Sequence, residues 1–335
     1  MKYLVTGGAG FIGSAFIRLK LRTEDSASVV NLDKLTYAGN LENLASVASD
    51  HRYRFVHGDI CDKALVRELV RDERPDMIVH FAAESHVDRS IHSPAPVIDT
   101  NFCGTFAMLE AAREFSVRFH HVSTDEVYGS IPAPHEADEN YPLITSSPYS
   151  ASKAGSDLLA LSYFTTYKLP VTVSRASNNY GPFHFPEKLI PLMISNAMED
   201  KPLPIYGDGM QIRDWLFVDD HCRGIAAIIQ SGRAGEIYNI GGNCSLPNIE
   251  VVQRILRALG KPDSLMKTVT DRPGHDRRYA LSSEKLTRQT GWSPQMDFDQ
   301  GLQETIDWYK NNSAWVDHVR SGEYRSFYEK NYANR

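Results

Sequence analysis

The beginning of this chain constrains its fold more than any other segment. Residues 2–22 read KYLVTGGAGFIGSAFIRLKLR, which is a short apolar run, a glycine-rich turn and then apolar residues at helical spacing. Apolar strands and amphipathic helices keep alternating to about residue 176, with further strands expected at 28–33, 53–60 and 76–85. Strands that alternate with helices at this spacing predict an α/β fold built on a doubly wound parallel sheet.

A second, smaller lobe is expected because the pattern loosens after residue 176. Segments such as NNYGPFHFPEKLIP and KPLPIYGDGMQIRDW are rich in proline, glycine and aromatic residues. GEIYNIGG, further along, again has the pattern of a strand of the large sheet, so the two lobes should interleave along the chain. We therefore predict a large-sheet domain of residues 1–176 plus about 215–243, and a smaller interleaved α/β substrate lobe of about 177–214 plus 244–335.

The composition excludes several classes of protein. A net charge of −6 argues against a broad nucleic-acid-binding face. Cys61, Cys103, Cys222 and Cys244 form no C-x-x-C pair and have no metal-ligand spacing, so we expect reduced thiols and no metal. The N-terminal apolar run is too short for a signal peptide, and no stretch approaches a membrane span. These features predict a cytoplasmic protein without a nucleic-acid or membrane partner.

The glycine-rich turn has the features of a dinucleotide-binding site. Gly7, Gly10 and Gly13 lie between the first strand and the first helix, where the backbone can approach a phosphate and the helix N-terminus attracts it. The next strand ends in Asp33, which can bind a ribose diol and repel a 2′-phosphate, so NAD is favoured over NADP. Lys34 weakens that argument slightly, and the alternatives are a plain strand–turn–helix and an aspartate that only caps the next turn. The spacing of the glycines resembles that of the extended short-chain dehydrogenase/reductase superfamily.

A second motif, SSPYSASKAGSDLLAL, supplies a candidate catalytic pair. Ser147 and Pro148 suit the start of a helix. Tyr149 and Lys153 then share one helix face, and we expect the ammonium to lower the pKa of the phenol from ~10. Such a tyrosine can take a proton from a sugar hydroxyl. Thr124, at the preceding strand end, matches the Ser or Thr that the superfamily sets beside that hydroxyl; by itself, the Tyr–Lys spacing is also common on solvated helix faces.

Two neighbouring acids, Asp125 and Glu126, follow Thr124 at the strand end. Adjacent carboxylates repel each other and resist burial, so a solvated turn is the simple alternative. An elimination uses both acids, because a base must remove a carbon-bound proton beside a carbonyl and an acid must protonate the leaving hydroxyl. We therefore interpret the pair as catalytic.

The motifs STDEVYG and YSASK closely resemble those of the dTDP-glucose 4,6-dehydratases. The likeness continues in LDKLTYAGNLENL, HFAAESHVDRSI, SNNYGPFHFPEKLIP, LPIYGDG, IRDW, GEIYNIGG and DRPGHDRRYA, and so extends over nearly the whole chain. It implies a Rossmann-type NAD-binding domain, a nucleotide-sugar-binding lobe, and conversion of dTDP-glucose to dTDP-4-keto-6-deoxyglucose and water. That reaction is a hydro-lyase step of deoxysugar biosynthesis.

The resemblance also implies positions for the site residues. The catalytic residues would be Thr124, Asp125, Glu126, Tyr149 and Lys153. The residues expected along NAD are Gly7, Gly10, Phe11, Ile12, Gly13, Asp33, Lys34, Leu35, Thr36, Asp59, Ile60, Phe81, Ala82, Ala83, Ser85, Thr100, Tyr149, Lys153 and Asn179. The residues expected along the nucleotide sugar are Ser85, Thr124 and Asn178 at the glucose, and Lys188, Leu189, Pro204, Ile205, Tyr206, Arg213, Asn248, Arg272 and His275 at the nucleotide diphosphate.

The chemistry of the last group supports its placement independently. Arg213 and Arg272 can each bind phosphate oxygens with two N–H groups, and Tyr206 offers a ring for stacking on a pyrimidine. The alternative for the RPGHDRR segment is an ordinary basic loop. Dimers of the superfamily pair two helices per subunit, and the apolar helices expected at about 95–114 and 148–168 predict a homodimer.

Two rival functions and one specificity stay open at the level of sequence. A UDP-sugar 4-epimerase has the same scaffold but needs no elimination. A non-catalytic NAD sensor needs neither Tyr149 and Lys153 nor the acid pair. The choice between thymidine and uridine is undecided, because a methyl-sized pocket discriminates by only about 1–3 kcal/mol. The segment 129–147 is shorter than in some relatives, and its effect on the site is open.

Overall fold

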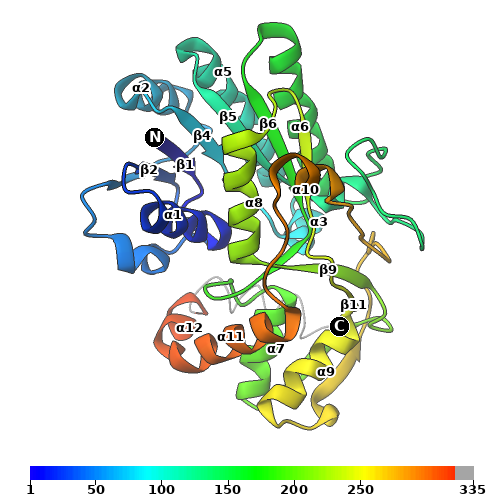
Figure 1. Ribbon diagram of the computed structural model, residues 1–335. Helices are drawn as coiled ribbons and strands as arrows, with labels where there is room; N and C mark the ends of the chain where they lie inside the picture. The colour runs from blue at the N-terminus through cyan, green and yellow to red at the C-terminus, as the bar shows by residue number, and fades with distance from the viewer. Residues whose placement is uncertain (321–335) are drawn as a thin grey trace.

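A seven-stranded parallel sheet forms the centre of the larger lobe in the computed structural model, which describes residues 1–320 (Figure 1). The strand order is β10-β6-β5-β4-β1-β2-β3, so the chain starts in the middle, winds to one edge and then returns to build the other. The predicted doubly wound parallel sheet is thereby confirmed. The strands are β1 (Lys2–Thr6), β2 (Ser28–Asp33), β3 (Tyr53–His57), β4 (Met77–His80), β5 (Arg118–Thr124), β6 (Val171–Ala176) and β10 (Ile237–Ile240).

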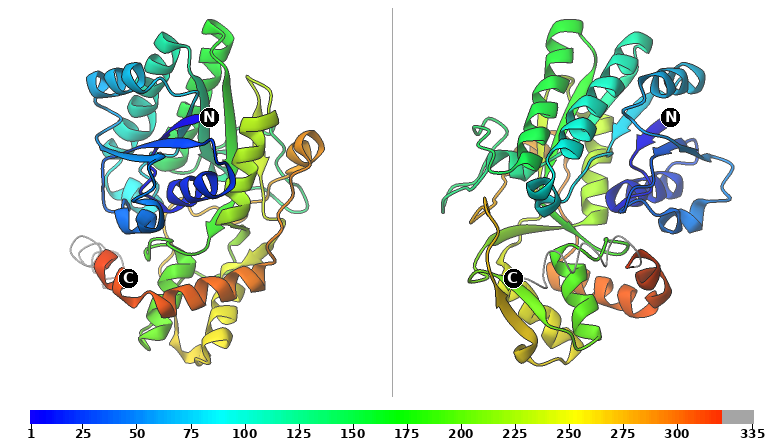
Figure 2. Two further views of the ribbon diagram at one scale, coloured as in Figure 1. Left: turned by 60° about the vertical axis from the view of Figure 1, so that its left-hand side comes forward. Right: turned by 180° about the vertical axis from the view of Figure 1, so that it is seen from behind.

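Helices cover both faces of this sheet (Figures 1 and 2). Helices α1 (Phe11–Thr23), α8 (Val218–Ser231) and α10 (Glu284–Thr290) lie on one face. Helices α2 (Lys63–Glu73), α5 (Thr105–Phe115) and α6 (Pro148–Tyr167) lie on the other, and the short α3 (Val87–His92) packs against α6.

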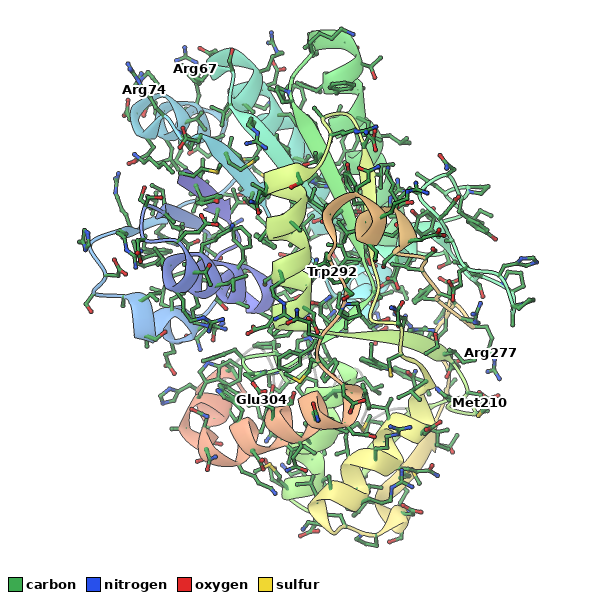
Figure 3. The ribbon with its side chains drawn as sticks, in the orientation of Figure 1. Arg67, Arg74, Met210, Arg277, Trp292 and Glu304 are labelled. Carbon is green, nitrogen blue, oxygen red and sulfur yellow. The ribbon has the colours of Figure 1, made fainter. Side chains whose placement is uncertain are left out.

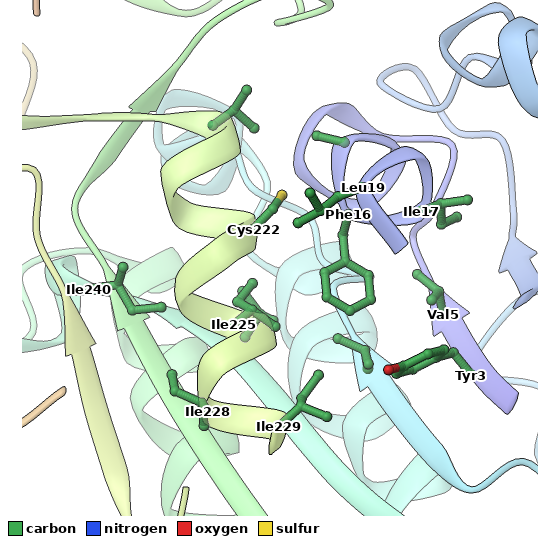
Figure 4. Close-up of a cluster of buried hydrophobic side chains, with 14 of the residues drawn as sticks. Tyr3, Val5, Phe16, Ile17, Leu19, Cys222, Ile225, Ile228, Ile229 and Ile240 are labelled. Carbon is green, nitrogen blue, oxygen red and sulfur yellow. The ribbon is translucent and has the colours of Figure 1, made fainter. Parts of the chain in front are cut away.

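The core between α1 and α8 shows how the first face is held. Figure 4 shows Phe16 of α1 between Ile225 and Ile229 of α8 on one side and Tyr3 and Val5 of β1 on the other. All five side chains are buried, so the glycine-rich turn is anchored to the sheet by the helix that follows it.

The helical run predicted from residue 95 is continuous but not uniform. It consists of α4 (Ala95–Ile98), a π-helical turn η2 (Asp99–Gly104) and α5. Asn101, in the π turn, accepts a hydrogen bond from Glu84 N at 2.8 Å and donates to Glu84 O at 3.0 Å and to Ser152 Oγ at 2.9 Å. The wider turn therefore aims one amide that ties the loop after β4 to helix α6, a use typical of π turns near functional sites.

The smaller lobe lies below the sheet in Figure 1. It contains a three-stranded sheet of β7 (Asn178–Tyr180), β9 (Ile212–Phe217) and β11 (Ser245–Pro247), and a parallel pair of β8 (Leu203–Tyr206) and β12 (Met266–Val269). Helices α7 (Leu189–Met198), α9 (Asn248–Leu259), α11 (Phe298–Asn311) and α12 (Ser313–Val319) enclose its own apolar core. Short 3-10 turns η1 (Leu41–Val47), η3 (Asp125–Tyr128) and η4 (Asp263–Leu265) complete the described elements.

One segment departs from the predicted lobe boundaries. Helix α10 packs against α8 and β10, and Leu286 and Trp292 belong to the core of the large sheet (Figure 3). The boundary that assigned all of residues 244–335 to the smaller lobe is therefore wrong for this segment, because its apolar residues are buried on the larger one. No helix within residues 1–320 is long and apolar enough to span a bilayer.

Candidate active site

A cavity of about 360 Å³ opens where β1, β2, β4, β5 and β6 end, at the junction of the two lobes. Ligands of doubly wound sheets bind at this edge. All five predicted catalytic residues line it. So does every residue predicted along NAD except Leu35, which lines a neighbouring cavity instead. Of the predicted substrate residues, the cavity brings together Ser85, Thr124, Asn178, Lys188 and Leu189.

The glycine-rich turn leaves no room for side chains. Gly7 has a φ of +69°, and a Cβ placed on it would lie 2.7 Å from Ala82 N. A Cβ on Gly13 would lie 2.3 Å from Gly7 O. Gly10 caps α1 without a side chain, so the N-terminal N–H groups of that helix face the cavity unobstructed. This backbone fits a pyrophosphate at a helix N-terminus.

Asp33 connects the second strand to the glycine-rich turn. Its Oδ2 accepts a hydrogen bond from Ala9 N at 2.9 Å, and its Oδ1 accepts one from Leu35 N at 2.8 Å. Burial raises the pKa of Asp33, and these two hydrogen bonds oppose the shift. The side chain thus caps the following turn and also lines the cavity, so the two interpretations from sequence are compatible. Lys34 Nζ lies 2.7 Å from Asp59 Oδ2, so the Lys34 ammonium is paired with that carboxylate.

The start of α6 presents Tyr149 and Lys153 as the sequence predicts. Ser147 and Ser150 form a reciprocal capping box, with Pro148 in the first turn. Lys153 Nζ donates to Val122 O of β5 at 2.7 Å.

The expectation that Lys153 lowers the pKa of Tyr149 is wrong for this structure. Burial raises the pKa of Tyr149, and the negative charges of Glu126 and Asp125 raise it further, while a hydrogen bond with Thr124 opposes the shift. Burial also lowers the pKa of Lys153 to about 8, against the attraction of Asp157. Desolvation is the largest cause of both shifts, because both side chains are buried.

The acid pair is not a solvated turn. Thr124 caps the 3-10 turn by accepting a hydrogen bond from Glu126 N, and Asp125 begins it with only 2% of its surface exposed. Within residues 1–320, Asp125 Oδ2 has no hydrogen-bond partner. Burial raises the pKa of Asp125 well above its ordinary range, and the charge of Glu126 adds to the shift.

Glu126 lies in a different electrostatic environment. Burial raises its pKa, but the charges of Arg272, Lys188 and Arg213 oppose the shift. The pKa values of the two adjacent carboxyls are thereby driven apart, because three cations favour the charged form of Glu126 while burial and the charge of Glu126 favour the neutral form of Asp125. This arrangement suits a base beside an acid.

The predicted diphosphate residues surround an acid that the sequence analysis missed. Arg272 Nη1 lies 3.2 Å from Asp88 Oδ1, and the Tyr206 hydroxyl donates to Asp88 Oδ2 at 2.9 Å. The His275 ring packs edge-on to Tyr206, with ring centroids 6.0 Å apart. Lys188 Nζ donates to Ser85 O at 2.6 Å. Arg272, Tyr206 and His275 are therefore grouped by contact around Asp88, whereas Lys188 contacts Ser85 and lines the cavity.

The remaining predicted residues are placed less directly. Pro204 and Ile205 lie on β8, and Asn248 begins α9 with Oδ1 unpartnered within the described part of the chain. The Arg213 guanidinium donates to Asp276 O and stacks 4.1 Å from the Tyr279 ring centroid.

The basic loop that carries Arg272 is held at its tip. Arg277 pairs with Asp208, and Figure 3 shows Arg277 beside Met210 at the same edge of the molecule. This ion pair joins the basic loop to the turn that follows β8.

Asn179 has a partner that the sequence analysis also missed. Its Nδ2 donates to Ser177 O, and its Oδ1 lies 2.9 Å from His221 Nδ1. Burial lowers the pKa of His221 to about 3, so the ring is neutral and donates from Nδ1. His221 lies on α8, far from Asn179 in sequence, so no sequence pattern linked the two residues.

Comparison with known proteins agrees with this geometry. The family model described as GDP-mannose 4,6 dehydratase matches residues 4–305. A dTDP-glucose 4,6-dehydratase from Shigella flexneri is 53% identical over 362 residues, with all of both chains covered. The chain belongs to the dTDP-glucose 4,6-dehydratase family.

Solved members of the dTDP-glucose 4,6-dehydratase family share its fold. The enzyme from Streptomyces venezuelae, solved with NAD and TYD bound, superposes with a TM-score of 0.93 at 51% identity, covering 95% of this chain and 100% of that one. A UDP-glucose 4-epimerase from Thermus thermophilus, solved with NAD, gives a TM-score of 0.87 at 31% identity, covering 93% and 100%. The scaffold is thus common to dehydratases and epimerases, and the site residues must distinguish them.

Proposed function

We propose that this chain is a dTDP-glucose 4,6-dehydratase, a lyase that uses NAD to convert dTDP-glucose to dTDP-4-keto-6-deoxyglucose and water. The observation that carries the proposal is the acid pair, Asp125 and Glu126, in the cavity that also holds Thr124, Tyr149 and Lys153. Oxidation or epimerisation at C4 needs only the last three. A buried neutral acid beside a carboxylate is otherwise unfavourable, and elimination uses both.

The residues of the cavity fit NAD. The glycine-rich turn and the start of α1 receive the pyrophosphate, and Asp33 receives the adenosine ribose. When bound, NAD supplies the positively charged hydride acceptor for C4 of the sugar and returns the same hydride to C6, so it is regenerated in each cycle.

The side chains then move protons at three atoms of the sugar. Tyr149, with Thr124 beside it, takes the proton of the C4 hydroxyl as the phenolate, a form that the positive charge of bound NAD would favour against the effect of burial. Glu126 takes the proton at C5, which the C4 ketone has made acidic, and Asp125 gives a proton to the C6 hydroxyl, which leaves as water. Glu126 returns its proton to C5 when C6 receives hydride, and the proton taken by Tyr149 balances the one given by Asp125.

Incubation with dTDP-glucose and UDP-glucose tests the proposal. The expected product of dTDP-glucose has lost water, and deuterium placed at C4 reappears at C6 in its NMR spectrum. A product of unchanged mass and inverted C4 would support the epimerase instead. Binding of NAD without turnover of either sugar would support a sensor, and the ratio of the two rates decides between thymidine and uridine.

The proposal includes a homodimer. Four exposed apolar side chains lie on the helices predicted to pair, namely Ile98, Phe102, Leu158 and Tyr167. Helices α5 and α6 lie side by side on the outer surface in Figure 2. Scattered single apolar residues need no explanation, but these four lie on two helical segments that pack against each other.

A cytoplasmic location is also part of the proposal. All four cysteines are free thiols. Unpaired cysteines are typical of a reducing compartment.

A further inference from the structure

Arg175 is a buried cation that the proposed mechanism does not use. It lies on β6 between Ser123 of β5 and Asn239 of β10, and only 2% of its surface is exposed. A guanidinium so far from water is unfavourable unless it is paired and hydrogen-bonded. The contacts of Arg175 therefore indicate its role in the structure.

The guanidinium bridges the two segments that carry the catalytic residues. Arg175 Nε donates to Asp157 Oδ2 at 2.9 Å, and Asp157 follows Lys153 by one turn of α6. Arg175 Nη1 donates to the Tyr128 hydroxyl at 2.9 Å, and Tyr128 ends the 3-10 turn that Asp125 begins.

The partners of Arg175 are themselves fixed. The Tyr128 hydroxyl donates to Asn239 Oδ1 at 2.9 Å, and Asn239 Nδ2 donates to Ala137 O at 2.9 Å. Asp157 Oδ1 lies 3.3 Å from His121 Nε2 of β5. The bridge is therefore a rigid connection between strands, helix and turn, because each end has a second anchor.

We propose that Arg175 is a positioning residue that sets the acid pair against the Tyr149–Lys153 helix. The inference rests on the proposed function. Oxidation uses Tyr149 and Thr124, whereas elimination uses the turn that ends at Tyr128. Loosening the bridge therefore slows elimination more than oxidation, since a displacement of about 1 Å can reduce a rate by about 100-fold.

Tyr128→Phe tests the bridge with the smallest change. It removes one hydroxyl and leaves the Arg175–Asp157 pair intact. Tyr238→Phe is the matched control, because Tyr238 is equally buried. Its hydroxyl accepts a hydrogen bond from Arg233 N and donates one to Gln289 Oε1, on the opposite face of β10 from Asn239. Single-turnover measurements follow cofactor reduction by absorbance and proton exchange at C5 in deuterated water, beside KM and the melting temperature.

Tyr128→Phe should slow C5 exchange and water loss by about 10- to 100-fold, with oxidation at C4 and KM within about threefold of wild type. Tyr238→Phe should lower the melting temperature similarly and leave every step unchanged. The inference is overturned if the rates of oxidation and elimination in Tyr128→Phe match those in Tyr238→Phe. It is also overturned if Tyr128→Phe slows oxidation and elimination by the same factor.

Arg175→Lys keeps the buried charge and so keeps Asp157 paired. A lysine ammonium cannot reproduce the planar guanidinium that binds Asp157 and Tyr128 at the same time. The variant should fold and show the same selective loss of elimination; full elimination by this variant also overturns the inference. Wild-type turnover in the same assay separates the two hypotheses. An inactive wild type contradicts the proposed function, whereas an active wild type with an unaffected Tyr128→Phe contradicts only the role of Arg175.

Discussion

The Thr124 hydroxyl donates to Asp125 Oδ1 at 3.3 Å, so the group proposed to orient the C4 hydroxyl also contacts the acid proposed for C6. Asp125 lines the cavity, and its other oxygen is buried without a hydrogen-bond partner within the described part of the chain. One strand end therefore serves two steps of the reaction, and single substitutions should separate them.

Removing the base or the acid should stop elimination while sparing oxidation. Glu126→Gln keeps the shape but cannot take the C5 proton, so proton exchange at C5 should fall by about 10²–10⁴-fold. Asp125→Asn should mainly slow loss of water, because an amide is a poor acid. Both variants should still bind dTDP-glucose and reduce NAD in a single turnover.

The control for this prediction is Asp138→Asn. Asp138 is an exposed acid in segment 129–147, and its side chain accepts a local hydrogen bond from Asn140 N. This variant should behave as wild type. Full dehydration by both Glu126→Gln and Asp125→Asn would show that STDEVYG is a structural turn.

Tyr149→Phe should block the first step instead. In the proposed mechanism the Tyr149 phenolate takes the proton of the C4 hydroxyl, so its loss should lower cofactor reduction by about 10²–10⁴-fold, measured as near-ultraviolet absorbance after mixing with dTDP-glucose. NAD and nucleotide binding should stay near wild type by calorimetry. Rapid cofactor reduction by this variant would assign the C4 proton to another group.

The sequence predicted the sheet, and it found the candidate catalytic residues that line one cavity, because both depend on local patterns. The strand, glycine turn and helix at residues 2–22 and the capping of α6 by Ser147 are short-range features that periodicity and spacing report directly. Arg175, Asp88 and His221 were not found, because each acts through a partner far away in sequence. The sign of the Tyr149 shift was also missed, since spacing places an ammonium nearby but does not report how deeply both groups are buried.

Asp33 should set the preference for NAD over NADP. Asp33→Asn removes the charge that repels a 2′-phosphate but keeps an oxygen for the Leu35 N–H group. NAD binding should weaken, and the ratio of the NADP dissociation constant to the NAD dissociation constant should fall by about tenfold from its wild-type value. Fluorescence titration of the wild type and the variant with both cofactors measures this ratio, and equal affinities in the wild type would contradict the role of Asp33.

Lys153 should make stability depend on pH in the alkaline range. Its folded pKa is about 8, below the ordinary value of 10.5. Between these values the unfolded chain binds more protons than the folded one, so the contribution of Lys153 to the free energy of unfolding rises with pH. Urea unfolding across this range should show wild type gaining up to about 3 kcal/mol relative to Lys153→Met. A difference that is flat with pH would mean that the ammonium is not desolvated in the fold.

The proposed dimer should dissociate when a charge is introduced into the apolar face formed by the π turn and α6. Leu158 is 58% exposed on α6, beside Phe102 of the π turn, so Leu158→Glu places a carboxylate in the centre of the predicted interface. An unpaired charge is strongly unfavourable in an interface core, so the variant should be a monomer at micromolar concentration in analytical ultracentrifugation. Met210→Glu is the control, because Met210 is 42% exposed between β8 and β9 of the smaller lobe, and this variant should remain a dimer. A monomeric wild type, or a Leu158→Glu variant that stays dimeric, would contradict the assignment of this face.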